Sequence, residues 1–422
     1  MRFRSAARTA FFMLAVAVTL AAQAPAMAHA QEDNLPSLRQ KAEAGDVQAQ
    51  FALADRYYRG VDVPQDYVQA LLWFRKSAAQ GYAPAQNQLG SIYQHKWGAP
   101  RDYKRALAWY RSAANQGYAP AEYNLAVMYR DGLWVGRDNK KAFPWYLKAA
   151  QQNLADAEEV VGFFYQNGLV VKRDYDQALV WYRRAAGHGS SNAENQLGYM
   201  AEKGWGQPQS YAEALSWYSK AAEHGSATAE QNIGFMYQYG TGVPVDYPQA
   251  RAWYYRAANQ GDGGSENQLG RMYQYGQGVR QDDAEALAWY RLSADTGNMN
   301  GKQSLDTFTD SLEDRGDGSL QVADNTAVHD PALDEARRWA DIRDLRSRIT
   351  GLESDAADQE TQAADLEHMG DKGKKNFIGK TFNAMGTVGA VKYHAEAAKF
   401  RAEAAQLRQQ LAQLESQTVP GR

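Results

Sequence analysis

Aromatic and small residues recur along the chain at a fixed interval of 36 residues. Tryptophan marks the interval at Trp73, Trp109, Trp145, Trp181, Trp217, Trp253 and Trp289. Another aromatic residue follows each tryptophan, and alanine stands three residues before it and five residues after it. These spacings place small and large apolar groups on helix faces that neighbouring helices can approach closely. A unit copied in this way predicts a solenoid.

Each copy carries signals for two helices. The helix that holds the tryptophan is preceded by Asp or Ser, whose side chain caps the free amide groups of a first turn. It ends at a glycine that only Asn153 replaces, and both residue types adopt the left-handed conformation that closes a helix. The other helix carries Ala85, Leu89, Gly90 and Tyr93 in one copy, at helical spacing. The unit is therefore predicted to be an αα-hairpin.

A family resemblance rests on the stretch from Ala229 to Tyr254, which contains Gly234, a glycine-rich turn and Trp253. This stretch resembles the Sel-like repeat, a relative of the tetratricopeptide repeat, and the likeness covers about residues 38–312. It implies an all-α fold, a right-handed α-solenoid, and a role as an adaptor for macromolecular assemblies, with no particular ligand. Some relatives carry a disulfide in each repeat. This chain has no cysteine, so the activity of that branch is not expected here.

The N-terminus predicts export. Three arginines precede an uncharged apolar run, and Ala28-His29-Ala30 offers a cleavage site of small residues. Residues 1–30 are therefore predicted to be a signal peptide, cleaved after Ala30, of a protein in the periplasm of a Gram-negative bacterium. An uncleaved membrane anchor is the alternative. The solenoid is assigned to residues 31–312.

The composition changes after the repeats. Residues 313–330 are polar and are predicted to be a linker. Apolar residues at heptad spacing predict a helix over 331–369 and a second over 392–418, separated by a glycine-rich, basic and apolar tip at 370–391. The two helices are predicted to form an antiparallel helical hairpin, a short coiled coil. Self-association of two chains through the same heptads is the alternative.

The tip carries the residues with the clearest potential for a second contact. Membrane-surface or partner contact is predicted for Lys374, Lys375, Phe377, Ile378, Lys380 and Phe382. A solvated turn is the alternative. The segment 373–381 is similar to a phosphate-binding loop, but five residues separate its glycines where the motif needs four, and no strand precedes it.

A partner is predicted to bind on the concave face, which the first helix of each unit lines in tetratricopeptide-like solenoids. Amide side chains suit an extended peptide backbone because they both donate and accept hydrogen bonds. The candidate residues are Gln88, Asn124, Asn195, Gln196, Asn232 and Gln268, with Tyr199, Phe235 and Arg271 as specificity positions. The alternative is that these amides are solvated or pair with one another between repeats.

Catalytic and metal chemistry is not indicated. The histidines form no metal-spaced cluster, and no nucleophile motif of a hydrolase is present, so we expect no enzyme activity, no metal and no cofactor. Removal of residues 1–30, which hold three arginines and no acid, takes the formal net charge from -3 to -6. This balance argues against nucleic-acid binding. The sequence thus predicts a periplasmic adaptor for a protein or peptide partner. Alternatives are a component of polysaccharide export or peptidoglycan remodelling, or, with less support, a hydrolase.

Overall fold

The computed structural model describes residues 34–97 and 99–314, part of the segment 345–363, and residues 377–418, with side chains in this last helix described for 393–413. The predicted signal peptide therefore lies outside the described residues. The helices of the repeat region are α1 (Leu35–Glu43), α2 (Val47–Arg59), α3 (Tyr67–Ala79), α4 (Ala83–His95), α5 (Tyr103–Ala114), α6 (Ala119–Asp131), α7 (Asn139–Gln151), α8 (Ala155–Asn167), α9 (Tyr175–Gly187), α10 (Ser191–Lys203), α11 (Tyr211–Glu223), α12 (Ala227–Tyr239), α13 (Tyr247–Asn259), α14 (Gly263–Tyr275), α15 (Asp283–Asp295) and α16 (Met299–Asp314). The C-terminal helix α18 spans Phe377–Thr418.

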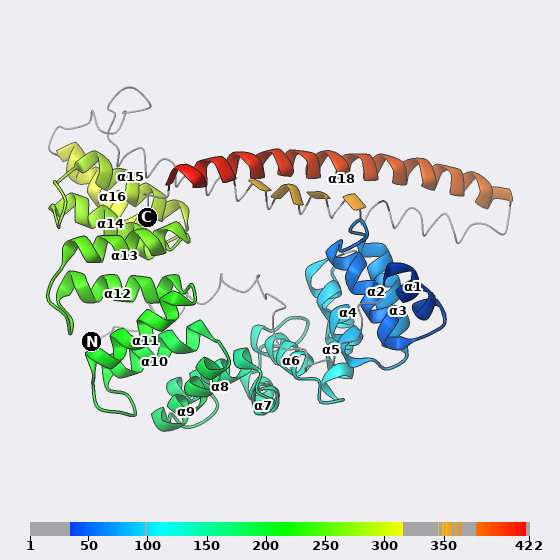
Figure 1. Cartoon of the computed structure of the whole chain (residues 1–422), viewed down its shortest axis with the longest axis horizontal. Helices are drawn as coiled ribbons and strands as arrows, with labels where there is room; N and C mark the ends of the chain where they lie inside the picture. Colours follow the sequence, from blue (N-terminus) through cyan, green and yellow to red (C-terminus); the bar gives the residue numbers. More distant parts are fainter. Residues whose placement is uncertain are drawn as a thin grey trace.

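Successive helix pairs from α2–α3 to α14–α15 stack into a curved array (Figure 1). The fold class predicted from the sequence, an all-α solenoid of hairpins followed by a C-terminal helical hairpin, is confirmed. In Figure 1, α6 and α8 lie on the inner side of the arc, and α7 and α9 lie on its outer side. Even-numbered helices therefore line the concave face.

The predicted caps are present at both ends of the odd-numbered helices. Asp174, for example, precedes α9, and its carboxylate accepts a hydrogen bond from the amide of Gln177 at 2.9 Å. Asn153 adopts φ 65°, the left-handed conformation that glycine adopts at the same position of the other repeats. Because the capping residues recur with the tryptophan, the helix boundaries were readable from the sequence.

The aromatic residue after each tryptophan is the deepest part of the core. Tyr182 is 0% exposed, and its ring packs on Gly162, where an added Cβ would lie 2.9 Å from ring carbons. The glycine thus admits a tyrosine ring. The tryptophans are less uniformly buried: Trp181 is 9% exposed and Trp289 0%, whereas Trp145 is half-buried. The sequence correctly indicated core positions, but it did not show that the neighbouring tyrosine is the better buried one.

The two C-terminal heptad segments pack against each other within one chain. Leu345 and Ile349 share an apolar cluster with Leu407. Arg401 pairs with Glu360 at 2.7 Å, and Arg408 pairs with Glu353, so the residue numbers rise in one segment as they fall in the other. This pairing is antiparallel, as predicted.

The glycine-rich tip differs from its expectation. Helix α18 begins at Phe377, whereas the sequence predicted a tip over 370–391 and a helix start at residue 392. Isolated glycines cost a helix about 1 kcal/mol each, and no proline interrupts this stretch. The helix therefore continues through them.

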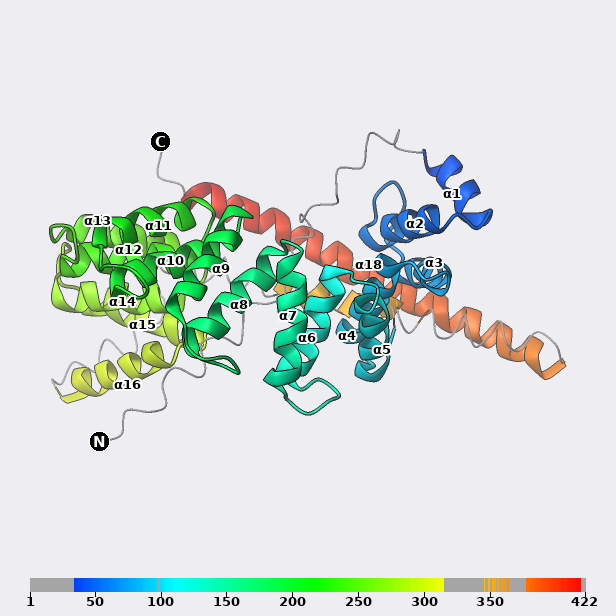
Figure 2. The ribbon, with the colours of Figure 1, turned by 90° about the horizontal axis from the view of Figure 1, so that it is seen from below.

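Helix α18 runs along the open side of the arc (Figures 1 and 2). Gln65, between α2 and α3, and Tyr67, the first residue of α3, line a small cavity together with Glu353, Arg401 and Arg408 of the C-terminal helical hairpin.

Candidate binding site on the concave face

The inner face presents one variable side chain per hairpin over a fixed frame. The residue after the small residue of each even-numbered helix is half-buried or exposed, whereas the leucine-type residue two positions earlier is buried. These inner-face residues are Ser91, Val127, Phe163, Tyr199, Phe235 and Arg271. They differ in size and charge while the frame beneath them repeats, so this row can distinguish one ligand from another.

The predicted amides are placed on the same helices, but several of them pair with one another. Asn124 donates to Asn87 at 2.9 Å, and Asn232 donates to Asn195 at 2.9 Å, each across two neighbouring repeats. Asn195 is 7% exposed and Gln268 is 8% exposed, so neither offers much surface to a partner. The half-buried Gln88 and Gln196 remain accessible. The alternative of amide pairing between repeats therefore describes the two asparagine pairs.

Aromatic side chains gather on the inner face of the later hairpins. Phe235 stacks on Tyr239 with ring centroids 6.0 Å apart, and Tyr199 meets Trp205 edge-on at 5.3 Å. Tyr239 is 53% exposed and Tyr275 is 62% exposed. Neither tyrosine is among the positions predicted from the sequence, although Tyr239 and Tyr275 stand one helical turn after Phe235 and Arg271, where they share a face with them.

Of the predicted C-terminal tip residues, Phe377, Ile378, Lys380 and Phe382 lie on the first turns of α18. Their side chains, and Lys374 and Lys375, lie outside the described residues. The tip therefore remains a prediction from the sequence.

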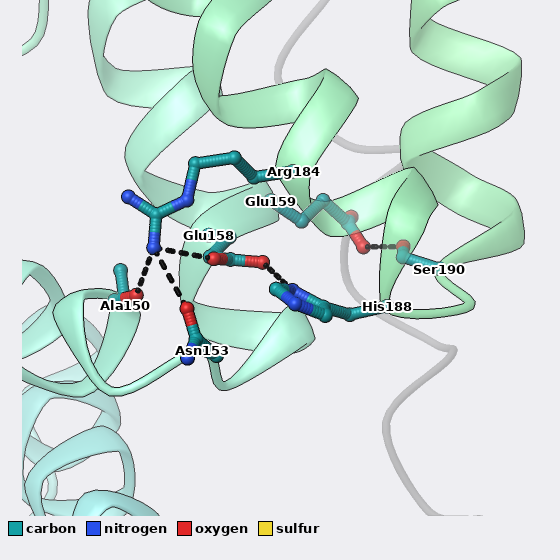
Figure 3. Close-up of polar contacts among 7 residues, drawn as sticks. All are labelled: Ala150, Asn153, Glu158, Glu159, Arg184, His188 and Ser190. Atoms are coloured by element: carbon teal, nitrogen blue, oxygen red, sulfur yellow. Dashed lines mark hydrogen bonds and ion pairs between the residues drawn. The ribbon is translucent and has the colours of Figure 1, made fainter.

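Buried carboxylates form a second repeating feature, which joins the two helices of a hairpin. Glu158 is 0% exposed and contacts Arg184 at 3.0 Å and His188 at 2.7 Å, both from α9 and the turn after it (Figure 3). Glu194 contacts His224 at 2.7 Å in the same way. The partner residues come from the following helix or from the residue directly after it, so each contact stabilises a hairpin. His188 and His224, which directly follow α9 and α11, thus serve as partners of buried acids.

Basic side chains of the odd-numbered helices, Arg184 among them, also pack on the tryptophan rings of these helices. Arg184 lies 4.5 Å from the Trp181 ring centroid, and Lys148 lies 4.3 Å from that of Trp145. Burial raises the pKa of Glu122 and of Glu230, whereas nearby Lys148 and Arg256 act in the opposite direction. Carboxylates at a 36-residue interval were visible in the sequence and could have revealed this seam. Because its groups are paired, we assign it to stability.

Helix α8 also carries two carboxylates, Asp156 and Glu159, for which the described residues show no ion pair. Asp156 and Glu159 stand three residues apart on α8 and lie near Tyr123 of α6, whose pKa is raised by burial first and then by these two charges. Burial raises the pKa of Glu159 to about 7, against a hydrogen bond from Ser190 at 2.9 Å. Burial of the carboxylate by the surrounding chain raises the pKa of Asp156 as well, although the residue as a whole keeps an exposed surface.

In the described part of the chain, no set of three or more His, Asp or Glu side chains is arranged to hold a metal ion. No helix among the same residues has the length and apolar character to span a bilayer.

Stacked helical hairpins with a variable inner face define a repeat-solenoid interaction protein. The Sel1 repeat matches seven consecutive segments, residues 47–82, 83–118, 119–154, 155–190, 191–226, 227–262 and 264–298, and the chain belongs to this family. Proteins built of Sel1 repeats are scaffolds for protein–protein interaction, and the fold is typically non-catalytic.

Solved structures share the arrangement. The protective antigen c5321 of uropathogenic Escherichia coli, which has an SLR fold, is 25% identical, with a TM-score of 0.57 over 92% of this chain and 98% of its own. A Sel1 repeat protein from Oxalobacter formigenes is 33% identical, with a TM-score of 0.54 over 58% of this chain and 99% of its own.

One curated relative matches locally. A stretch of 44 residues is 46% identical to the secretory immunoglobulin A-binding protein EsiB of Escherichia coli O6:H1 (strain CFT073). This stretch is 10% of this chain and 9% of EsiB, so the match is about one repeat long.

Proposed function

We propose that this protein is a non-enzymatic scaffold of the bacterial cell envelope that binds a segment of a partner protein on its concave face. The observation that carries the proposal is the row of variable inner side chains, including Tyr199, Phe235 and Arg271, over a repeated and buried frame. A face of this kind varies recognition without changing the fold. The relative EsiB is described as binding secretory immunoglobulin A, which agrees with a protein ligand.

The proposed location is the periplasm, on the basis of the signal sequence in residues 1–30. In that compartment the absence of cysteine leaves the solenoid indifferent to oxidation. The C-terminal tip would supply a second contact, to an anionic membrane surface or to a partner. Co-sedimentation of the full chain with phosphatidylglycerol vesicles, with and without Phe377→Ser and Phe382→Ser, tests this second contact.

Site-specific photo-crosslinking in cells tests the concave face. A photoreactive phenylalanine analogue is placed at Tyr199 or Phe235 on the inner face, and at Val180 or Leu72 as controls. Both control residues are more exposed than the half-buried inner positions, at 50% and 45%, and they lie on the odd-numbered helices. We expect a discrete protein adduct from the inner positions only. Adducts of equal yield from all four positions, or a glycan adduct, would refute the proposal.

A further inference from the structure

We infer that one edge of the solenoid, formed by the turns that follow α4, α6 and α8, docks on an anionic membrane surface. This edge is distinct from the concave face, so the inference goes beyond the proposed function. It is carried by two observations. Exposed apolar residues on this edge hold a left-handed backbone where other repeats have glycine, and basic side chains beside them lack an ion pair in the described part of the chain.

The turns that join an even-numbered helix to the next odd-numbered helix follow one another along this edge. Gly206, in the turn after α10, lies so close to the start of α9 that an added Cβ would be 3.0 Å from the backbone of Tyr175. Gly242, in the turn after α12, packs in the same way on Tyr211 at the start of α11. Each of these turns therefore covers the start of the preceding odd-numbered helix, and glycine permits the close approach.

Two repeats depart from the glycine at this position. Trp134 has φ 67° and Val170 has φ 69°. The equivalent residues of the later turns are Gly206, Gly242 and Gly278, with φ 69°, 74° and 68°. The left-handed region is costly for a residue with a Cβ, and most of all for a bulky or β-branched one. Trp134 is 62% exposed and Val170 is 46% exposed, so neither offsets this cost by packing in the core. Exposed apolar residues on a strained backbone point to an external contact.

Basic residues accompany these two positions, in the same turns or in the first helical turn after them. Six are exposed and have no ion pair among the described residues: Arg101, Lys104, Arg137, Lys140, Lys172 and Arg173. The capping aspartates of α5 and α7 pair with other basic residues, Arg105 and Lys141, at 3.2 and 3.4 Å, and Asp174 adds a third acid. The equivalent turns at 204–210 and 240–246 contain no Lys or Arg. This edge is therefore locally positive on a chain whose formal net charge is negative.

The combination of an exposed tryptophan with basic side chains suits the headgroup region of a bilayer. Tryptophan rings are favoured at the boundary between headgroups and acyl chains, and Lys and Arg are attracted to anionic headgroups. An acidic protein would pair with the charges, whereas a bilayer surface accommodates the charges and also a protruding apolar side chain without a matching shape. We therefore assign the edge to an anionic lipid surface.

Co-sedimentation with vesicles of phosphatidylglycerol and phosphatidylcholine tests the inference on the chain without residues 1–30, a segment that is itself apolar and basic. The double variant Trp134→Gly, Val170→Gly introduces the residue that the later repeats carry. We expect it to bind about tenfold more weakly than wild type, while its urea midpoint stays the same or rises. A purely structural role would give a lower midpoint and unchanged binding. The matched control Leu72→Ser, Val180→Ser, at exposed positions of odd-numbered helices, should leave binding within about twofold.

A second variant tests the charges. Arg137→Gln, Lys172→Gln should weaken vesicle binding about tenfold or more, and added salt should weaken wild-type binding in the same direction. The control Arg280→Gln, Arg291→Gln removes the same charge from exposed positions of the last hairpin and should leave affinity within about twofold.

A site-specific label shows whether the edge itself enters the bilayer surface, because the chain has no other cysteine to react. An environment-sensitive dye on Val170→Cys should shift to shorter emission wavelengths with phosphatidylglycerol vesicles. The same dye on Val245→Cys, a 53% exposed position in the turn after α12, should not shift.

Three results would overturn the inference. The first is no vesicle binding by wild type, or equal binding by wild type and Trp134→Gly, Val170→Gly. The second is binding to poly-L-glutamate but not to vesicles, which would assign the edge to an acidic protein. The third is a loss of vesicle binding in Phe377→Ser, Phe382→Ser alone, which would assign membrane contact to the C-terminal tip. Photo-crosslinking on the concave face is independent of all three, so the proposed function is tested separately.

Discussion

Two buried tyrosines at the same position of adjacent hairpins offer a test of what holds the solenoid together. Tyr182→Phe and Tyr146→Phe each remove one oxygen atom and leave a ring that is 0% exposed. The hydroxyl of Tyr182 donates to Gln166 Oε1 at 2.6 Å, and Gln166 is itself 8% exposed. The hydroxyl of Tyr146 is buried without a partner.

The two substitutions should change the free energy of unfolding differently. Tyr182→Phe loses one hydrogen bond and leaves a buried acceptor unpaired, so the free energy of unfolding should fall by about 1–2 kcal/mol. Tyr146→Phe removes a polar atom whose desolvation nothing offsets, so stability should stay unchanged or rise by up to about 1 kcal/mol. Tyr254→Phe serves as a second paired case, because its hydroxyl donates to Gln238 at 2.6 Å.

Urea unfolding followed by circular dichroism gives the global free energy, and hydrogen exchange gives the local one. The local measurement is needed because repeats contact only their neighbours and can unfold in steps. We expect faster exchange in α8 and α9 of Tyr182→Phe, and no change in α6 and α7 of Tyr146→Phe. An equal loss of stability at both positions would refute the argument that pairing of the hydroxyl decides the cost.

Three further predictions concern charge, topology and export. Burial raises the pKa of Glu159 in the folded chain to about 7, above its unfolded value, so the folded chain is most stable at low pH and loses stability as the pH rises towards 7. In Glu159→Gln the fall in the free energy of unfolding between about pH 4.5 and about pH 7, measured by urea unfolding, should be smaller by about 1–3 kcal/mol. An unchanged pH dependence would contradict the raised pKa. Glu353→Cys with Arg408→Cys, in a chain otherwise free of cysteine, should oxidise to a monomer on a non-reducing gel, whereas a covalent dimer would indicate self-association. Mass spectrometry of the protein from a Gram-negative host should give a chain that begins at Gln31, and retention of residues 1–30 would disprove cleavage.

The parts of the fold that the sequence predicts are those that each hairpin repeats. Asp174 and Asn153 have a role that depends only on the local backbone, so their spacing sufficed to mark helix ends. Pairing of the heptad segments also follows from local pattern, since each Ala-rich seam buries little surface without its mate. The alternative of self-association was not decided by pattern, because the same seam suits either pairing.

The features that the sequence did not reveal depend on contacts between helices, within a hairpin or from one hairpin to the next. Glu158 resembles a surface residue in the sequence, and only the packing of α9 on α8 makes it a buried acid in contact with Arg184 and His188. Similarly, Asn195 looked available for a partner, but it accepts a hydrogen bond from Asn232 of the next repeat. The start of α18 at Phe377 was missed for another reason: glycines weaken a helix without ending it unless a cap or a proline follows.

Departures from the repeat are informative because the other copies show what the frame requires. The frame needs a glutamine or glutamate to accept the buried tyrosine hydroxyl, as Gln166 and Gln238 do. Arg130 breaks this rule: it pairs with Asp131 and leaves the buried hydroxyl of Tyr146 without a hydrogen-bond partner. Such a group lowers stability and contributes nothing to the fold. The hairpin of α6 and α7 therefore lacks one buried hydrogen bond that the hairpins of Tyr182 and Tyr254 keep, which is why Tyr146→Phe and Tyr182→Phe should differ in cost.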